Sequence, residues 1–327
     1  MTIIVTGSIA VDHLTSFRGR FVDQFVPDSL DRVSLSFLVD SLDVRRGGVA
    51  ANIGLGLARL GLRPVIVAAA GVDFADYRSW LERNGLDVSF IAVSEELHTA
   101  RFLCTTDQDG NQIASFYPGA MTEAQKLELR PTVEQVGGTN LVIISPNDPA
   151  AMLRHTDECR ANEYPFAADP SQQLAFMRPA DICRLVDGAR YLFTNEYEHA
   201  LVLQKTGWTQ REILARVGTW VTTLAAKGAR IESLDHPAEE VSAVAVDAEI
   251  EPTGVGDAFR AGFLAGVNWG LPDVRAAQLG CALAALVLRT VGPQEYDIHP
   301  TAFANGLAST YGRTAASEIG QRLPWAR

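Results

Sequence analysis

The segment Pro252–Phe259 reads PTGVGDAF and places Gly254 and Gly256 directly before an apolar stretch that predicts a helix. Glycines let a backbone approach a ligand closely, and the unpaired N–H groups at a helix N-terminus direct partial positive charge towards an anion. Asp257 falls in the first helical turn, where a carboxylate can accept a proton from a hydroxyl that attacks a bound phosphate. The segment predicts a phosphate-type anion site with a general base beside it. A glycine turn followed by a carboxylate that complements the helix dipole is the alternative.

Around this segment, short apolar strands alternate with helices along the chain. Predicted strands are Thr2–Gly7, Val65–Ala69, Leu141–Ser145, Pro165–Ala168, Tyr191–Thr194 and Thr219–Leu224. Predicted helices are Val49–Leu60, Ala75–Asn84, Pro149–Ala161 and Glu196–Lys205. Such alternation is typical of an α/β fold with a mostly parallel sheet covered by helices on both faces. The last third is mainly helical over Asp257–Trp269, Val274–Leu288 and Thr301–Gly320, and we expect these helices to cap one sheet edge.

Two segments depart from this alternation. Val33–Val44 and His98–Phe116 each have one polar and one apolar side, and the second folds back at Asp107–Asn111 (DQDGN). Both patterns predict extended strands of a small second sheet. The sequence contains no internal repeat and no long Pro/Gly linker. We therefore expect a single α/β domain over residues 1–327 with two excursions, at about residues 13–46 and 98–117.

The composition excludes several classes of protein. Of the 327 residues, 28 are basic and 39 acidic, so a chain with a net charge of −11 lacks the basic surface of a nucleic-acid-binding protein. The longest nearly apolar run, Leu279–Leu288, holds 10 residues, which is too few to cross a membrane. The four cysteines form no C-x-x-C pair and no basic segment precedes the first strand, which favours reduced thiols and a cytoplasmic protein. The sequence contains neither a P-loop lysine motif nor a G-x-G-x-x-G after a strand, which argues against P-loop enzymes and nicotinamide dehydrogenases.

Two further positions suit a ligand that carries hydroxyl groups. Gly47 and Gly48 precede the predicted helix that carries Asn52, whose amide offers both a donor and an acceptor. Asp12 follows the first strand in GSIAVD, where its carboxylate can bind two neighbouring sugar hydroxyls. The structural alternatives are a glycine turn for the first position and a cap or turn residue for the second.

Together these segments resemble the ribokinase, or phosphofructokinase-B-type, family of carbohydrate kinases. The resemblance covers nearly the whole chain and rests on Gly47-Gly48-x-x-x-Asn52, Asn195-x-x-Glu198 and Pro252–Asp257, in that order. It implies a Rossmann-like α/β core whose excursions form a β-sheet lid over the sugar. It also implies ATP as the phosphate donor and Mg²⁺ held near Asn195 and Glu198 through water or phosphate. The sequence leaves a requirement for K⁺ open.

The nucleotide side of the resemblance contains two departures from the family pattern. The family's Thr-x-Gly-x-x-Gly element corresponds to residues 223–228, and the resemblance implies that ATP lies near Asn195, Thr223, Lys227, Gly228, Gly254 and Gly256. Ala225 stands where a glycine is expected, which fits only if its φ stays negative or the ligand does not press on its Cα. Glu251 replaces the usual aspartate, so its carboxylate reaches one methylene further. A solvated loop lysine is the alternative for Lys227.

A narrower resemblance is to the actinobacterial type of adenosine kinase, in the segments GSIAVDH, SLSFLVD, HTARF, ASFYPGAM, DPSQQLA, FTNEYE and GPQEY. It implies that adenosine is the substrate, that AMP is the product and that the enzyme serves purine salvage. The substrate residues that it implies are Ser8, Asp12, Ser36, Gly47, Gly48, Asn52, Phe102, Phe116, Gln172 and Gln173, with the two phenylalanines flanking the base. Packing within a lid sheet is the alternative for Phe102 and Phe116, and capping of the helix after Pro170 is the alternative for the two glutamines.

The sequence leaves three functions open. The first is ATP-dependent phosphorylation of the 5′-hydroxyl of adenosine, and the second is phosphorylation of a free sugar or another nucleoside on the same fold. The third is ligand sensing by an inactive kinase fold, against which the intact Asp257 argues. Exposed ribbon edges such as Val33–Val44 need covering, so we also expect a homodimer that forms through the lids.

Overall fold

The computed structural model describes residues 2–25, 35–247 and 250–326. Within them lies a nine-stranded sheet with the order β13-β12-β11-β10-β9-β8-β1-β4-β5. Its strands are β1 (Ile3–Thr6), β4 (Val65–Ala70), β5 (Ile91–Val93), β8 (Leu141–Ile144), β9 (Phe166–Ala168), β10 (Tyr191–Asn195), β11 (Thr219–Thr223), β12 (Ala229–Ser233) and β13 (His236–Val241). Neighbouring strands from β5 to β11 are parallel, and β12 and β13 continue the sheet antiparallel. The predicted α/β fold with a mostly parallel sheet is confirmed.

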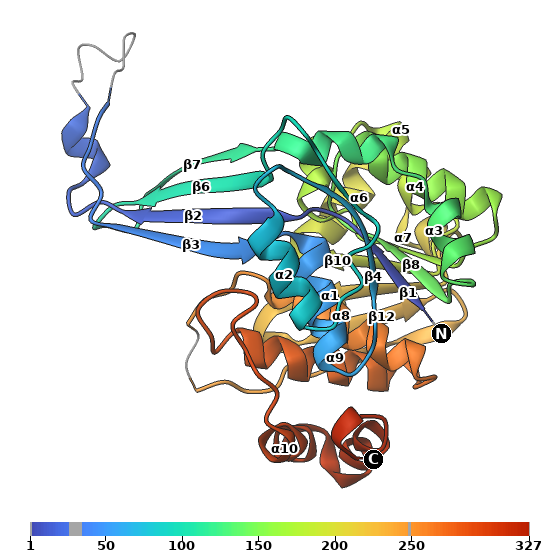
Figure 1. Cartoon of the computed structure of the whole chain (residues 1–327). Helices are drawn as coiled ribbons and strands as arrows, with labels where there is room; N and C mark the ends of the chain where they lie inside the picture. The colour runs from blue at the N-terminus through green and yellow to red at the C-terminus, as the bar shows by residue number, and fades with distance from the viewer. Residues whose placement is uncertain (1, 26–34, 248–249, 327) are drawn as a thin grey trace.

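Helices cover both faces of this sheet (Figure 1). One face carries α1 (Val49–Arg59), α2 (Ala75–Arg83), α8 (Val255–Asn268) and α9 (Asp273–Val287), with α10 (Pro300–Gly320) outside them. The other carries α3 (Leu129–Gln135), α4 (Pro149–Ala161), α5 (Pro179–Val186), α6 (Glu196–Thr206) and α7 (Gln210–Leu214). Strand β1 serves both cores, because Ile3 and Val5 point into the first and Ile4 into the second.

The expectation that the C-terminal helices cap one sheet edge is wrong. Phe259 and Phe263 of α8 pack against strand residues such as Phe193 of β10, in the middle of the sheet. Helices α8 and α9 therefore cover a face of the sheet, and α10 packs on their outer side. Small residues let α8 and α9 approach each other closely. Gly262 of α8 lies so near Gly280 of α9 that a Cβ on Gly262 would come within 2.6 Å of the Gly280 Cα.

A second, four-stranded sheet has the order β3-β2-β6-β7 and projects from the body of the molecule (Figure 1). Its strands are β2 (Ala10–Ser16), β3 (Ser41–Gly47), β6 (Ala100–Thr106) and β7 (Gln112–Tyr117). The predicted hairpin is present, because Asp107 accepts hydrogen bonds from the N–H groups of Asp109 and Asn111 and turns the chain between β6 and β7. The second sheet that the sequence predicts is confirmed.

The strand expected over Val33–Val44 begins later than predicted. Residues 35–39 are not in a strand, and Val33 and Ser34 lie outside the described residues. Phe37 instead packs against Phe17 and Phe21 beyond the ends of β2 and β3, with ring centroids 4.9 and 5.4 Å apart. Phe37, which the alternating pattern assigned to a strand, therefore belongs to an aromatic cluster at this end of the sheet.

Short 3₁₀ turns complete the fold at η1 (Phe21–Gln24), η3 (Gly119–Lys126), η4 (Ser171–Ala175), η5 (Ala225–Lys227) and η6 (Pro324–Ala326). No helix within the described residues is long and apolar enough to cross a membrane. Turn η5 joins β11 to β12 and contains Ala225, whose φ is +50°. This left-handed conformation strains any residue that has a Cβ, so the condition of a negative φ at Ala225 is not met.

Replacing Ala225 with glycine should therefore stabilise the protein. We expect Ala225→Gly to raise the free energy of unfolding by about 1 kcal/mol, because glycine adopts a positive φ without the steric penalty of a Cβ. The neighbouring Ala226→Gly is the matched control. It should lower stability by roughly 0.5–1 kcal/mol, since it adds only freedom to the unfolded chain. Urea unfolding of the two variants measures both effects, and equal stabilities would contradict the strain at Ala225.

Candidate active site

A cavity of about 460 Å³ lies between the smaller sheet and the ends of several strands of the larger sheet. Parallel sheets bind ligands at their carboxyl ends, where loops from neighbouring strands meet. Ten of the predicted residues line it: Ser8, Asp12, Gly48, Asn52, Phe102, Phe116, Gln172, Gln173, Gly254 and Asp257. The cavity is also lined by residues that the sequence did not predict: Ala10, Val49, Met121, Pro146, Phe176 and Thr253. Most of these are small or apolar residues that give no chemical signal in a sequence.

Not every predicted substrate residue lines this cavity. Ser36 is exposed and lies next to Phe37 of the aromatic cluster. Gly47 stands behind the cavity wall, where a Cβ would approach the Asp12 Oδ2 to 3.0 Å. Gln173 lines the cavity and donates to the carbonyl oxygen of Asn147 at 2.9 Å, and neither glutamine caps η4.

The entry to α1 is built around Gly48. With φ at +94°, Gly48 crosses the turn after β1 so closely that a Cβ would lie 2.5 Å from the backbone nitrogen of Ala10. The Ser8 hydroxyl accepts a hydrogen bond from the N–H of Val49, the first residue of α1, at 3.1 Å. This close crossing joins strand β3 of the smaller sheet to α1, and it brings Asn52 to the cavity.

Asp257 lies in the first turn of α8, which begins after the left-handed Gly254. Its Oδ2 accepts a hydrogen bond of 2.8 Å from the Nδ2 of Asn52. Burial raises the pKa of Asp257, whereas the positive charge of Arg260 and the Asn52 hydrogen bond act in the opposite direction. A carboxylate placed at the cavity wall and supported in its charged form can serve as a proton acceptor.

Arg260 supplies the positive charge beneath this turn. It donates to the Asp169 Oδ1 at 2.6 Å, and the side chains of Arg260 and Asp169 are 9% and 0% exposed. Burial raises the pKa of Asp169, and the guanidinium opposes that rise. The sequence did not predict this pair, because its members lie 91 residues apart and only Asp169 belongs to a quoted segment, DPSQQLA.

Asp12 is the second carboxylate of the cavity. Burial raises its pKa to about 6, the nearby Glu251 adds to the rise and Arg45 opposes it. Glu251 itself pairs with Arg45 on β3 and accepts the N–H of Gly292 at 3.1 Å. The longer carboxylate at position 251 therefore connects the base of the smaller sheet to the loop after α9.

A second cavity, of about 510 Å³, lies on the other side of the first turn of α8. Thr223, Gly228 and Gly256 line it as the nucleotide-side prediction places them, together with Pro252, Val255 and Phe259. Its remaining walls are mostly apolar: Ala225, Ala226, Ala243, Val244, Ala245, Val246, Cys281, Ala284, Ala285 and Leu288. In the sequence the apolar residues of α9 resemble ordinary core, so they were not predicted. One helix turn thus separates a cavity with carboxylates from one suited to an apolar ring.

Asn195 and Lys227 are not among the lining residues of either cavity. Asn195 caps α6, accepting from the Glu198 N–H while Glu198 Oε2 accepts from the Asn195 N–H, both at 2.8 Å. Lys227 is exposed, and its Nζ lies 3.9 Å from Glu196. The predicted magnesium element is therefore also a capping box. The box does not use the Glu198 Oε1, which accepts a hydrogen bond from the Ser171 hydroxyl at 3.4 Å.

The residues present fit a Mg²⁺ ion only if water and substrate phosphates supply most of its ligands. The described residues contain no group of three or more His, Cys, Asp or Glu that could hold a metal by themselves. Mg²⁺ commonly binds one or two carboxylates and completes its shell with water and substrate phosphates. The Glu198 Oε1 and the unpartnered Asp169 Oδ2 are oxygens suited to such a site.

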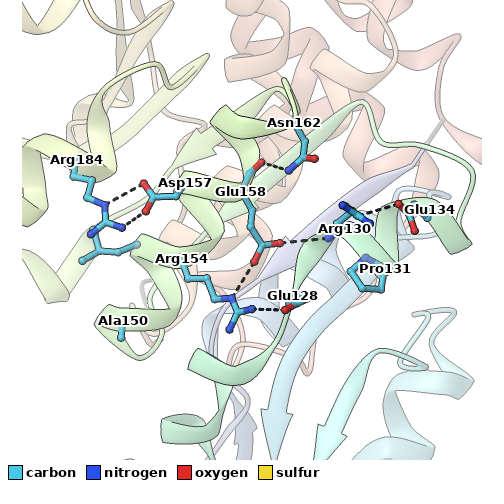
Figure 2. Close-up of a pocket in the computed structure, with 11 residues that line it drawn as sticks. Glu128, Arg130, Pro131, Glu134, Ala150, Arg154, Asp157, Glu158, Asn162 and Arg184 are labelled. Atoms are coloured by element: carbon cyan, nitrogen blue, oxygen red, sulfur yellow. Dashed lines mark hydrogen bonds and ion pairs between the residues drawn. The ribbon is translucent and has the colours of Figure 1, made fainter.

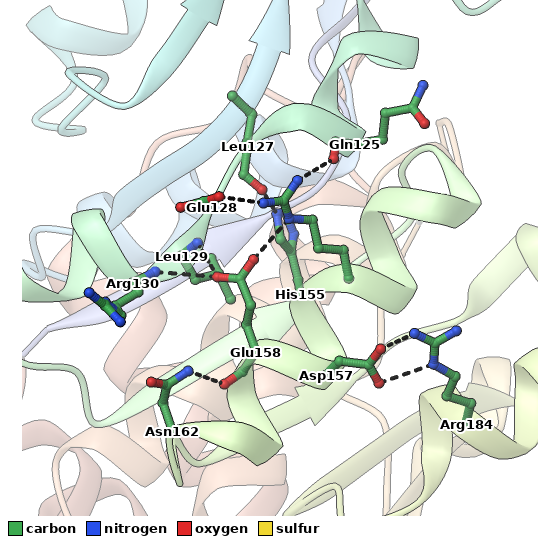
Figure 3. A network of polar contacts seen from close by, with 11 residues as sticks. Gln125, Leu127, Glu128, Leu129, Arg130, His155, Asp157, Glu158, Asn162 and Arg184 are labelled. Carbon is green, nitrogen blue, oxygen red and sulfur yellow. Dashed lines mark hydrogen bonds and ion pairs between the residues drawn. The ribbon is translucent and has the colours of Figure 1, made fainter.

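A larger cleft of about 730 Å³ lies away from this site, over α3, α4 and α5 (Figure 2). Its charges are matched within its wall: Arg154 pairs with Glu128 and Glu158, Arg184 with Asp157, and Arg130 with Glu134. Figure 3 shows Glu158 also accepting the backbone N–H groups at the start of α3, including that of Leu129 at 2.6 Å.

Nearby, His155 lies buried with its Nε2 3.2 Å from the Leu127 carbonyl oxygen, and burial lowers its pKa to about 4 (Figure 3). The imidazole is therefore neutral at pH 7. The polar groups of this cleft stabilise the contact between α3 and α4 and leave no unpaired charge for a substrate.

Known proteins resemble this chain in sequence and in structure. A nucleoside kinase of Methanothermobacter thermautotrophicus is 31% identical over 252 residues, which cover 76% of this chain and 80% of that protein. The solved structure of a Burkholderia thailandensis nucleoside kinase with inosine is 32% identical, has a TM-score of 0.81 and is matched over 95% of this chain and 98% of that one. Its complex with ADP-inosine is 33% identical with a TM-score of 0.79, over 95% and 96% of the two chains.

The family model of the pfkB carbohydrate kinases matches residues 9–300. This match begins just before β2 of the smaller sheet and ends at the start of α10. It therefore contains every lining residue of both cavities except Ser8, and the helix turn between them. The chain therefore belongs to the pfkB family of carbohydrate kinases, which are phosphotransferases with an alcohol acceptor.

Proposed function

We propose that this kinase transfers the γ-phosphoryl group of ATP to the 5′-hydroxyl of adenosine, giving AMP and ADP. The observation that carries the proposal is the position of Asp257, which lies on the one helix turn that separates the two cavities. An acceptor hydroxyl in the first cavity and a phosphate chain that enters from the second would meet at this turn. The ADP-inosine complex of the Burkholderia relative supports one ligand in each cavity.

The lining of the first cavity favours a nucleoside over a free sugar. Phe102 and Phe116 lie opposite each other on β6 and β7 and line the wall that the smaller sheet forms. Aromatic rings in this place can stack on a purine. Asp12 and Asn52 offer polar atoms for the ribose, and Gln172 and Gln173 offer amides. The inosine that the Burkholderia enzyme binds is also a purine nucleoside. Adenosine kinase activity of this kind would serve purine salvage.

The mechanism follows from the residues around α8. Asp257 accepts the proton of the attacking hydroxyl, and its charged form is supported by Asn52 and Arg260. The N–H groups at the start of α8, near Gly254 and Gly256, stabilise the negative charge of the transferred phosphoryl group. Mg²⁺, when held by Glu198 and Asn195 through water or phosphate, neutralises phosphate charge.

We also propose that the excursions at about residues 13–46 and 98–117 act as a lid on a single α/β domain and that two lids pair in a homodimer. Leu42, Val44, Leu103, Ile113 and Tyr117 are 39–61% exposed on the smaller sheet. The strand register places these five side chains on the same face, opposite the one that carries Phe102 and Phe116. A second copy of this face would cover them.

Because ATP and reduced thiols such as those of the four free cysteines belong to the cytoplasm, we propose that the enzyme works there.

The first prediction concerns the general base. Asp257→Asn preserves shape but cannot accept the proton, so kcat should fall by about 10²–10⁴-fold while nucleoside affinity changes little. Asp273→Asn, on the first turn of α9, is the matched control and should retain kcat. Steady-state kinetics and calorimetric binding measure both variants, and near-normal turnover of Asp257→Asn would refute the assignment.

The second prediction concerns the substrate. Adenosine should exceed ribose and fructose in kcat/KM, because stacking adds ~1–3 kcal/mol that a free sugar cannot gain. Deoxyadenosine should be poor, since an unpaired buried acceptor at Asp12 costs ~1–3 kcal/mol. A coupled ADP-release assay compares these compounds with inosine at saturating MgATP. The Phe116→Ala variant should bind adenosine more weakly, and its affinity for ribose should fall less. A higher kcat/KM for a sugar or for inosine would contradict the assignment of adenosine as the substrate. If the protein binds ATP but releases no ADP with any of these compounds, a sensor function would be favoured.

The third prediction concerns assembly. Light scattering at micromolar concentration should give the mass of a dimer, and Leu103→Lys should shift it towards the monomer by placing a charge in the apolar face. Leu234→Lys is the control, because Leu234 has the same exposure (40% against 41%) but lies between β12 and β13. A monomeric mass for the unmodified protein would rule out the dimer.

A further inference from the structure

We propose that Gln294 is a positioning residue for catalysis, which holds the amide of Asn52 in the one orientation that donates a hydrogen bond to Asp257. This inference rests on the proposed role of Asp257 as proton acceptor. Gln294 lies in the loop between α9 and α10 and is 1% exposed. It belongs to the GPQEY segment, to which the sequence analysis assigned no substrate or nucleotide residue. It takes no part in lining either cavity.

The orientation of the Gln294 amide is determined by Trp80. The indole Nε1 of Trp80 can only donate, and it lies 3.2 Å from the Gln294 Oε1. The Nε2 of Gln294 must therefore point the other way, where it donates to the Tyr77 hydroxyl at 2.5 Å and to the Asn52 Oδ1 at 2.9 Å. The backbone carbonyl of Gln294 also accepts from the Arg59 Nη2 at 3.0 Å. Each polar group of this side chain thus has a partner.

This arrangement in turn determines how Asn52 faces the carboxylate. Because Gln294 presents a donor, the atom of Asn52 that faces it must be the acceptor Oδ1. The Nδ2 then points at the Asp257 Oδ2, 2.8 Å away. Without Gln294, rotation of the Asn52 amide would place its oxygen against the carboxylate. The hydrogen bonds therefore run from the Trp80 indole, through the amides of Gln294 and Asn52, to the Asp257 carboxylate. They allow only one orientation of each amide.

The same contacts reach the base of the smaller sheet. The Tyr77 hydroxyl, which accepts from Gln294, donates to the carbonyl oxygen of Gly47 at 2.8 Å. Gly47 is the last residue of β3 and precedes the left-handed Gly48. Gln294 therefore connects the strand that leads into the proposed lid with the side chain that supports Asp257.

A hydrogen bond to the charged form of a carboxyl group lowers its pKa. The other groups that face Asp257 are Arg260 on its own helix, Asp169 after β9 and the Tyr296 hydroxyl in the loop of Gln294. Arg260 favours the charged carboxylate, whereas Asp169 and Tyr296 bring no positive charge. Loss of the Asn52 donor should therefore shift the acid limb of the rate profile to higher pH, because Asp257 would stay protonated further up the pH scale.

Gln294→Met tests the inference, since methionine has a similar length and no donor. We expect the acid limb of kcat to rise by about 1 pH unit, with a smaller change in KM for the nucleoside. Gln278→Met is the matched control, because Gln278 is also a buried glutamine but contacts Arg275 on α9. Its acid limb should not move. In an Asn52→Ala background, Gln294→Met should add no further shift, because its effect passes through Asn52.

An unchanged acid limb in folded Gln294→Met, or a full additional shift in the Asn52→Ala background, would overturn the proposal. If Gln294→Met does not fold, Trp80→Phe removes the donor that orients Gln294 and keeps the glutamine itself, and its acid limb should move the same way. If the unmodified protein phosphorylates no acceptor, the proposed function fails by itself. Infrared titration of the protonated carboxyl band that Asp257→Asn lacks then tests Gln294→Met without turnover, with the same rise expected.

Discussion

A carboxylate that is largely buried must be kept charged by its neighbours, and the centre of this molecule is built around that constraint. Asp257 meets water only on its cavity side, so the Asn52 amide and the Arg260 guanidinium replace part of its hydration. Each of these neighbours needs a partner in turn, which Gln294 supplies for the first and Asp169 for the second. The requirements of one charge thereby fix α1, α8, the end of β9 and the loop after α9 relative to one another.

Few positively charged side chains are available to bind the phosphates of a nucleotide. With a net charge of −11, the chain attracts no polyanion over distance, and Lys227 is exposed beside Glu196. Arg260 is the cation beneath the first turn of α8, and it is already paired. Backbone N–H groups of α8 are therefore the main source of positive potential at the junction of the cavities, as expected for an anion site that carries no side-chain charge of its own.

The sequence predicted the larger sheet well because strand and helix periods alternate clearly from Thr2 to Leu224. It could not predict β5, which has three residues, or β13, whose HPAEEV sequence is mostly polar and exposed. The predicted residues that gather around the first cavity are those whose types carry chemistry at strand ends and helix starts. The predictions missed the apolar wall of the second cavity, where α9 residues resemble ordinary core.

The sequence could not predict contacts between distant segments, and the reason is different. Gln294 and Asn52 are 242 positions apart, and only the packing of α1 against the loop after α9 brings their amides together. Similarly, nothing local distinguishes Phe37, which joins an aromatic cluster, from a strand residue. The sign of φ at Ala225 depends on the closure of the β11–β12 turn rather than on its own neighbours in the sequence.

The single helix turn between the two cavities has a consequence for inhibition. Groups bound in the two cavities are near neighbours, so a molecule that joins two nucleosides through a short phosphate chain can occupy both at once. Binding of its second half is then intramolecular, and the entropy of association is lost only once. Selectivity among related kinases would come from the second half of such a molecule, because one apolar residue exchanged for another among the alanines and valines of its cavity changes the shape of the wall and leaves the carboxylates of the first cavity intact.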